Sequence, residues 1–354
     1  MVLGLSFAMS YKPHLIMVVG PTGIGKTRLA LQLASRLQCP IVSADSRQIY
    51  REMPIGTAAP TQSEQSLVKH YMVGVASIRE PFSIAHYEEK TIPLLETLFT
   101  KYSSVVMCGG SMLYLDVIEK GIDAIPSIDP KVRDLIQSRL QNEGAERLRE
   151  ELKLVDPFYY EDVDLANTKR IIHALEVYYT TGKPYSFFRK GYTASRPFHI
   201  YKVYIEMPRE QLYERINLRT EKMLRSGWLK EALSLYPYRS FNALNTIGYK
   251  ELFSFFESAT KKLQGRKDGK PISIEDVDES IAPMVEILEC NPLFLKDSFL
   301  REEYLATVAK IQAATRQYAR QQTIRFRQDS RAIRVSTTIE TTALLPLLIG
   351  RGKR

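Results

Sequence analysis

The segment Gly20-Pro21-Thr22-Gly23-Ile24-Gly25-Lys26-Thr27 fits the pattern G-x-x-x-x-G-K-[ST], in which a glycine-rich turn surrounds phosphate groups. An apolar run precedes it at residues 15–19, and a helical pattern follows it at residues 28–34. In this strand–loop–helix context, backbone N–H groups and the positive end of a helix dipole converge on phosphate oxygens. We therefore expect these eight residues to bind a diphosphate, with Lys26 neutralising charge and the Thr27 hydroxyl binding magnesium.

The pattern around this segment predicts an α/β fold, a P-loop doubly wound parallel sheet with a helical insertion domain and additional C-terminal helices. Further apolar runs at residues 40–44, 104–108 and 198–206 indicate strands. Residues 131–180 have helical patterns only, and residues 263–300 are predicted to be irregular. The predicted domains are the first part of the core (12–121), the helical insertion (122–196), the resumed core (197–335) and a tail (336–354).

Composition fits a globular protein of one or two domains, since 44% of the 354 residues are hydrophobic. The apolar stretches are too short to span a bilayer, and residues 1–9 lack the basic start and cleavage site of a signal peptide, so we expect a loose extension there. The cysteines have no C-x-x-C spacing, which indicates neither a disulfide framework nor a zinc site: Cys39, Cys108 and Cys290. We expect a cytoplasmic protein without a membrane partner.

A basic surface is the second general feature of the chain, whose formal net charge is +9. Six arginines lie between Arg316 and Arg334, against the single acid Asp329. Such a cluster fits contact with the phosphates of a nucleic acid, and it equally fits a helix whose charges are merely solvated.

Asp45 follows the apolar run at residues 40–44, and the Gly109-Gly110 turn follows the run at 104–108. Ligands of doubly wound sheets bind beyond the carboxyl ends of the strands, so both should face the phosphate loop. Asp45 could cap the next helix, hold magnesium, or take a proton from a nucleophile. A P-loop kinase or hydrolase usually has a strand that ends in aspartate, whereas this strand ends in Cys108, which argues against ATP hydrolysis.

The chain resembles the tRNA dimethylallyltransferases, also called tRNA isopentenyltransferases, of the bacterial type. The phosphate loop carries the resemblance together with further blocks in family order: Asp45-Ser-Arg-Gln-Ile-Tyr50, Met53-Pro-Ile-Gly-Thr57, Gly109-Gly-Ser-Met-Leu-Tyr114, Asp129-Pro-x-Val-Arg133, Val155-Asp-Pro157, Lys169-Arg170, Ala174-Leu-Glu-Val177, Arg219 with Met223-Leu224 and Gly227, Gly248-Tyr249, and Ala314-Thr-Arg-Gln-Tyr-Ala-Arg-Gln321. Residues 256–305 match little. The zinc finger of eukaryotic relatives is absent from the sequence, in agreement with the bacterial type.

The resemblance implies transfer of a dimethylallyl group from dimethylallyl diphosphate to N6 of the adenosine 3′-adjacent to the anticodon, without consumption of ATP. The adenosine is flipped out of its stack, and Asp45 takes the N6 proton. Thr22, Arg219 and Mg²⁺ stabilise the leaving diphosphate. The insertion grips the anticodon stem-loop of the tRNA, and we expect a monomer.

The resemblance also implies a set of tRNA-binding residues: Asp45, Ser46, Arg47, Gln48, Ser111, Arg133, Lys169, Arg170, His173, Gly248, Tyr249 and Lys250. The Gln48 amide is of a type that can pair with the edge of an unstacked adenine. Three positions depart from the family pattern. Ser111 replaces a threonine and keeps its hydroxyl, whereas His173 and Lys250 stand where arginine is common.

Three other functions remain open at the level of sequence. An adenylate isopentenyltransferase would share the loop and Asp45 but would modify a free nucleotide, for which neither the insertion nor the arginine-rich helices are needed. A P-loop small-molecule kinase or NTPase would turn over ATP. A noncatalytic RNA-binding module would bind RNA equally well after Asp45→Ala and would form no product.

Overall fold

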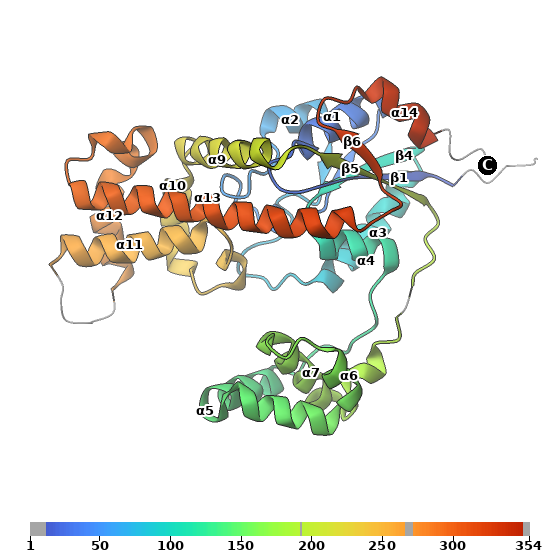
Figure 1. Cartoon of the computed structure of the whole chain (residues 1–354), viewed down its shortest axis with the longest axis horizontal. Helices are drawn as coiled ribbons and strands as arrows, with labels where there is room; N and C mark the ends of the chain where they lie inside the picture. Colours follow the sequence, from blue (N-terminus) through green and yellow to red (C-terminus); the bar gives the residue numbers. More distant parts are fainter. Residues whose placement is uncertain (1–11, 192, 266–271, 350–354) are drawn as a thin grey trace, which may run out of the picture. The chain divides into compact units, whose positions relative to one another are not determined.

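The structure is a computed structural model that describes residues 12–191, 193–265 and 272–349, so the extension predicted at residues 1–9 lies outside the described residues. The chain forms two compact units (Figure 1). The core unit holds the described residues up to 118 and from 196 onward, and the helical unit holds residues 119–195. None of the helices in the described ranges is long and apolar enough to cross a membrane.

A six-stranded sheet in the order β3-β2-β4-β1-β5-β6 forms the centre of the core unit, and all its strand pairs are parallel. The strands are β1 (His14–Val19), β2 (Ile41–Ser43), β3 (His70–Tyr71), β4 (Ser104–Gly109), β5 (His199–Glu206) and β6 (Ile333–Ser336). In register, Val19 at the end of β1 lies beside Gly109 of β4. The predicted doubly wound parallel sheet is confirmed, and the loops after β1, β2 and β4 emerge at one edge.

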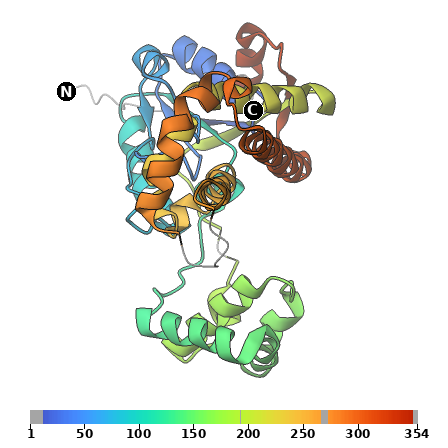
Figure 2. The same cartoon turned by 90° about the vertical axis from the view of Figure 1, so that its left-hand side faces the viewer.

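Helices surround the central sheet (Figure 2), and two apolar layers of side chains cover its faces. Alternate residues of β1 belong to different layers: Leu15 and Met17 to one, Ile16 and Val18 to the other. Because both faces of β1 are buried, this strand is apolar without alternation. The first layer includes α3 (Ile84–Phe99) and α4 (Met112–Lys120), and the second includes α1 (Lys26–Leu37), α9 (Arg209–Arg225) and α14 (Thr341–Ile349).

The rest of the core unit is helical. Its elements are α2 (Gln62–Leu67), α10 (Trp228–Leu235), η1 (Tyr236–Tyr238), η2 (Asn242–Leu244), α11 (Tyr249–Leu263), α12 (Ile274–Cys290), η3 (Pro292–Phe294) and α13 (Ser298–Arg327). The prediction of irregular structure at residues 263–300 is wrong for residues 274–290, which form α12, while residues 266–271 lie outside the described residues. Pro283 suggests a break, but a capping box at Ser273 begins the helix, and an apolar stripe that includes Val277 and Ile281 packs it into the core.

The prediction of a tail at residues 336–354 is also wrong in its described part. Residues 341–349 form α14, and Leu344 and Leu348 are buried in the layer that includes α1. The segment is short and contains Pro346, so its own pattern gives no helix signal. Packing against the sheet layer stabilises the helix instead.

The helical unit consists of α5 (Pro130–Val155), α6 (Pro157–Asp162), α7 (Thr168–Thr181) and α8 (Tyr185–Phe188). Asp129 and Asn167 cap the starts of α5 and α7, and α5 bends at Gly144, where φ is +81°. The unit has its own apolar core, formed around Ile136, Leu148, Leu152, Ile171 and Leu175.

The close approach of β2 and β4 at the loop-bearing edge depends on Gly109. A Cβ atom at Gly109 would lie only 2.1 Å from the carbonyl oxygen of Ala44. The Ala44 N–H donates to the Cys108 carbonyl at 2.8 Å, and the Ser111 N–H donates to the Ala44 carbonyl at 3.2 Å. The absence of a side chain at Gly109 therefore lets Asp45 and the turn after β4 lie side by side.

We predict that Gly109→Ala lowers the free energy of unfolding by roughly 3 kcal/mol, because backbone atoms must shift to admit the methyl group. Urea denaturation followed by circular dichroism measures this loss. Gly74→Ala is the control, since the nearest atoms there are 3.7 Å away and only the left-handed φ of +61° opposes it, for a loss of about 1 kcal/mol. Equal losses in the two variants would contradict the steric argument.

Candidate active site

The phosphate loop joins β1 to α1 and presents backbone rather than side chains. Gly23 and Gly25 have φ values of +81° and +104°, in the left-handed region that favours glycine. Helix α1 begins at Lys26, so its first N–H groups lie at the end of the loop. Three residues of the loop are buried: Gly20, Pro21 and Ile24. The other five line a cavity of about 640 Å³: Thr22, Gly23, Gly25, Lys26 and Thr27.

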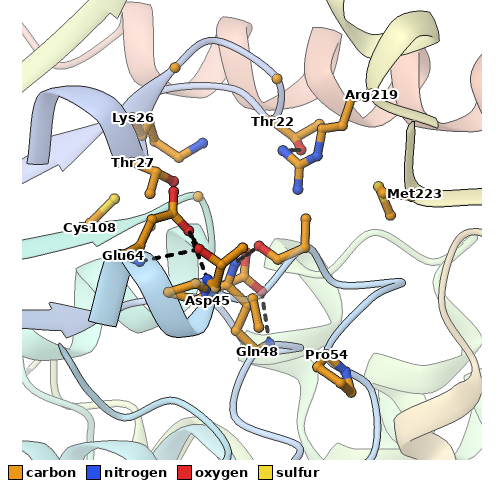
Figure 3. A pocket seen from close by; sticks show the side chains of 18 of the residues that line it. Thr22, Lys26, Thr27, Asp45, Gln48, Pro54, Glu64, Cys108, Arg219 and Met223 are labelled. Atoms are coloured by element: carbon orange, nitrogen blue, oxygen red, sulfur yellow. Dashed lines mark hydrogen bonds between the residues drawn. The ribbon is translucent and has the colours of Figure 1, made fainter. Parts of the chain in front are cut away.

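This phosphate-loop cavity is completed by five other segments (Figure 3). Asp45 and Gln48 come from the chain after β2, and Cys108, Gly109 and Gly110 from the end of β4. A further segment lies within residues 54–64 and includes the acid Glu64. Helices α9 and α13 contribute the last two: Arg215, Arg219, Lys222, Met223, Tyr318 and Gln322. The structure thus brings Asp45, the Gly109-Gly110 turn and Arg219 to the phosphate loop.

The two cations of this cavity that are not exposed, Lys26 and Arg219, have no acidic partner. The Lys26 Nζ donates to the Pro21 carbonyl at 2.9 Å, and the Arg219 Nη1 donates to the Thr22 Oγ1 at 3.4 Å. Within the described ranges, neither side chain forms an ion pair. Burial lowers the pKa of Lys26 to about 8, and Arg219 adds to this effect while Cys108 and Asp45 oppose it. Burial also lowers the pKa of Arg219. A bound anion would stabilise both charged forms.

Asp45 is held in a fixed orientation by its own backbone neighbours. Its Oδ1 accepts hydrogen bonds from the N–H groups of Arg47 at 2.9 Å and Gln48 at 3.4 Å. The following residues form turns, so Asp45 caps a turn and not a helix. Among the described residues, none donates to its Oδ2, which leaves this oxygen for a substrate.

A second cavity of about 360 Å³ adjoins the first. The two cavities share five lining residues: Thr22, Asp45, Arg219, Met223 and Tyr318. Four residues predicted to bind tRNA also line the second cavity: Ser46, Arg47, Ser111 and Lys250. Asp45 therefore lies at the boundary between a cavity with unpaired cations and a second cavity of mixed polarity.

Three other residues predicted to bind tRNA make contacts within the protein instead. The Gln48 amide accepts from the Ser43 Oγ at 3.1 Å and donates to the Ala58 carbonyl at 3.0 Å. Tyr249 is fully buried, and a Cβ atom at Gly248 would lie 2.0 Å from Trp228. These contacts indicate that Gln48, Gly248 and Tyr249 support the cavity walls.

The other predicted tRNA-binding residues lie in the helical unit: Arg133 on α5, and Lys169, Arg170 and His173 on α7. The Arg133 Nε is 3.8 Å from the Glu176 Oε1, and the His173 Nδ1 is 3.7 Å from the Glu176 Oε2. The structure therefore groups Arg133 and His173 around one mostly buried carboxylate.

Sequence reasoning missed Gln322, which is buried on α13. Its Oε1 accepts from the Thr22 N–H at 2.9 Å, and its Nε2 donates to the Gly110 carbonyl at 2.7 Å. Gln322 thus joins the phosphate loop to the turn after β4. Gln322 lies four residues after Tyr318, which lines both cavities, so the two residues share a face of α13. This spacing points to the site only when the position of α13 beside the cavities is known.

Fold and site together define a P-loop α/β protein in which a carboxylate lines a cavity with unpaired cations. Residues 48–329 match the family model described as IPP transferase. The tRNA dimethylallyltransferase 2 of Parabacteroides distasonis is 49% identical over 242 residues, 68% of this chain and 81% of that protein. The tRNA dimethylallyltransferase 1 of Bacteroides thetaiotaomicron is 49% identical over 245 residues, 69% of this chain and 80% of that protein.

Solved structures of two transferases are similar to this chain. The full-length tRNA isopentenylpyrophosphate transferase of Bacillus halodurans matches with a TM-score of 0.58 and 25% identity, over 96% of this chain and 97% of that chain. A eukaryotic dimethylallyltransferase acting on tRNA has a TM-score of 0.65 at 19% identity, over 96% of this chain and 77% of that chain, and shows the shared fold. The chain belongs to the IPP transferase family, which confirms the resemblance found in the sequence.

We predict that inorganic diphosphate binds this cavity with an affinity that falls above pH 8. Binding favours the Lys26 ammonium, whose pKa is about 8 in the free protein. The dissociation constant should therefore rise about tenfold per pH unit above that value. Calorimetric titration at several pH values measures this rise. Lys26→Met should bind weakly and retain only the pH dependence of diphosphate itself, so parallel pH profiles for the two proteins would contradict the role of Lys26.

We predict that Gln322→Leu weakens the binding of diphosphate about tenfold or more. The substitution leaves the Thr22 N–H and the Gly110 carbonyl without their partner, and each buried orphan group is unfavourable by roughly 1–3 kcal/mol. Titration calorimetry measures affinity, and urea denaturation measures stability. Gln321→Leu, at an exposed neighbouring position, is the control. A Gln322→Leu protein with unchanged affinity would show that the phosphate loop keeps its shape without this bridge.

Proposed function

We propose that this protein transfers a dimethylallyl group from dimethylallyl diphosphate to N6 of the adenosine 3′-adjacent to the anticodon in tRNA, and releases diphosphate. The observation that carries the proposal is the position of Asp45, which lines both the cavity with the unpaired cations and the second cavity. A group at this boundary can act on an acceptor from one cavity and a donor from the other. Membership of the IPP transferase family supports this assignment.

The donor's diphosphate binds at the phosphate loop. As the carbon–oxygen bond of the donor breaks, negative charge builds up on the leaving diphosphate, where the loop N–H groups, Lys26 and Arg219 stabilise it. These cations are already unpaired and desolvated, so little reorganisation is needed during the reaction. Thr22 acts beside them, because its hydroxyl accepts the Arg219 hydrogen bond and orients the guanidinium.

Magnesium fits this site as a partner of the diphosphate. The described residues contain no converging group of three or more His, Cys, Asp or Glu side chains. Thr27, an exposed residue in the first turn of α1, would supply one oxygen ligand through its hydroxyl, and diphosphate and water would supply the others. When bound, the ion neutralises charge on the leaving group.

The acceptor adenine enters the second cavity. Its N6 amine is a weak nucleophile because the lone pair is delocalised into the ring, so a proton must leave as the new bond forms. The Asp45 Oδ2 takes this proton while Oδ1 keeps its backbone hydrogen bonds. Arg47 and Lys250 in the same cavity suit the sugar–phosphate chain on either side of the flipped base.

We assign to the helical unit a contact with the anticodon stem-loop, because Lys169 and Arg170 are exposed in the first turn of α7. A free adenine nucleotide would not need such a surface. Because tRNA is the acceptor, we place the reaction in the cytoplasm.

We predict that Asp45→Asn lowers kcat for prenyl transfer by about 10²–10⁴-fold and changes the KM for the donor only a few-fold. The amide preserves the shape and the Oδ1 hydrogen bonds but cannot accept the N6 proton. The assay combines isotopically labelled dimethylallyl diphosphate with unmodified tRNA and detects adenosine that carries one added five-carbon group.

Glu52→Gln is the matched control, since Glu52 accepts from Ser77 and Ile78 and lines neither cavity. Undiminished turnover in Asp45→Asn would remove Asp45 from the mechanism. Parallel reactions with AMP as acceptor and with ATP alone test the two enzymatic alternatives. Release of γ-phosphate without prenyl transfer would overturn the proposed function.

A further inference from the structure

A seven-residue segment, residues 53–59, contributes lining residues to both cavities and is called the partition loop here. Four of its residues line the phosphate-loop cavity: Pro54, Ile55, Ala58 and Ala59. Ile55 is followed by Gly56 and Thr57, which line the second cavity. One short stretch of backbone therefore forms a wall between the proposed donor and acceptor sites.

The partition loop has a backbone conformation that its own sequence does not favour. Ala58 has a φ of +45°, in the left-handed region where a residue with a Cβ atom is strained. Internal hydrogen bonds join the Thr57 Oγ1 to the Met53 carbonyl at 2.6 Å and the Ala59 N–H to the Pro54 carbonyl at 2.9 Å. Strained backbone of this kind persists only where surrounding groups hold it in place.

Gln48 holds the loop at Ala58, to whose carbonyl its Nε2 donates at 3.0 Å, and Glu231 on α10 holds it at Ile55 and Gly56. The Glu231 Oε2 accepts from the Ile55 N–H at 2.8 Å, and its Oε1 accepts from the Gly56 N–H at 2.8 Å. The Tyr249 hydroxyl also donates to Oε1, at 2.5 Å. Glu231 lines neither cavity, so it acts on the site only through the loop.

The packing around Gly56 shows how closely the loop is seated. A Cβ atom at Gly56 would lie 2.0 Å from the Trp228 Nε1 and 2.4 Å from the Tyr249 Oη. The loop therefore packs directly against α10 and α11. This close packing leaves no space in which the loop could adjust to a small change in the Glu231 carboxylate.

We propose that Glu231 is a positioning residue: by holding the Ile55 and Gly56 N–H groups, it fixes the partition loop that aligns the allylic carbon with the acceptor amine and excludes water from that carbon. This inference rests on the proposed prenyl transfer. Displacement of positioned reactants by about 1 Å can lower a rate about 100-fold. The loop needs to move only slightly for the effect to be measurable.

A misplaced loop would also open a competing reaction. Water would then attack the allylic carbon as its bond to the diphosphate oxygen breaks, which yields dimethylallyl alcohol, diphosphate and a proton. The ratio of alcohol to prenylated RNA thus measures how well the partition loop excludes water from the allylic carbon. Simple loss of folded protein lowers both products together and leaves their ratio unchanged.

The test compares wild type with Glu231→Gln, in which the amide NH₂ faces one of the two N–H groups and cannot accept from it. We expect kcat for transfer to fall at least tenfold, the KM for dimethylallyl diphosphate to change less than threefold, and the alcohol-to-RNA ratio to rise at least fivefold. Labelled donor and an unmodified anticodon stem-loop allow both products to be quantified in one reaction.

One matched control isolates the loop contacts. Glu289→Gln alters another partly buried carboxylate, which accepts from the Lys230 N–H at the start of the same helix and does not contact the loop. Its product ratio should be unchanged. Tyr249→Phe is a graded variant, because it removes the third hydrogen bond of Glu231 but keeps both bonds to the loop, so its product ratio should rise less than that of Glu231→Gln.

If Glu231→Gln fails to fold, Glu231→Asp replaces it, because the shorter carboxylate keeps its charge but cannot reach both N–H groups. A normal product ratio in the folded variant would overturn this inference and leave the proposed function intact. Wild-type protein that forms no prenylated RNA would instead overturn the proposed function.

Discussion

The side-chain amide of Gln322 joins the segments on which the site depends. One end binds the phosphate loop at Thr22 and the other binds the turn after β4 at Gly110, although the three residues are far apart in the chain. A buried amide whose two ends are satisfied by different segments stabilises only one relative placement of them. The long helix α13 therefore completes the phosphate site, in addition to covering the sheet.

The charges of the site follow from this placement. Lys26 and Arg219 are brought together without a carboxylate at either one, which is unfavourable in the free protein and favourable once an anion binds. The one acid of the shared wall, Asp45, is turned by the N–H groups of Arg47 and Gln48. Unpaired cations near a carboxylate that the backbone orients suit a reaction in which a carbon–oxygen bond breaks and a nitrogen that attacks the same carbon loses a proton.

The sequence predicted the features that have a local cause. The glycines of residues 20–25 and the apolar runs of β1, β2, β4 and β5 gave the sheet and the phosphate loop. Strand β3 has only two residues, and α12 contains Pro283. The local sequence therefore predicts neither element, and both depend on packing against the rest of the core. Gln48 and Tyr249 lie in matching motifs, but only the structure shows that they hold the walls. Glu231 was missed because its partners, Ile55 and Gly56, are distant in the sequence.

The end of β4 separates this site from one built for ATP hydrolysis. Many P-loop enzymes have an acid at this strand end, where it helps to hold the metal and the attacking water. Here the position is Cys108, and burial raises the pKa of its thiol to about 11, so the group stays neutral. A neutral strand end leaves the positive charge of Lys26 and Arg219 uncancelled at the phosphate loop. This arrangement suits the proposed stabilisation of a departing diphosphate, while Asp45, the carboxylate proposed to take the proton, follows β2 and lines both cavities.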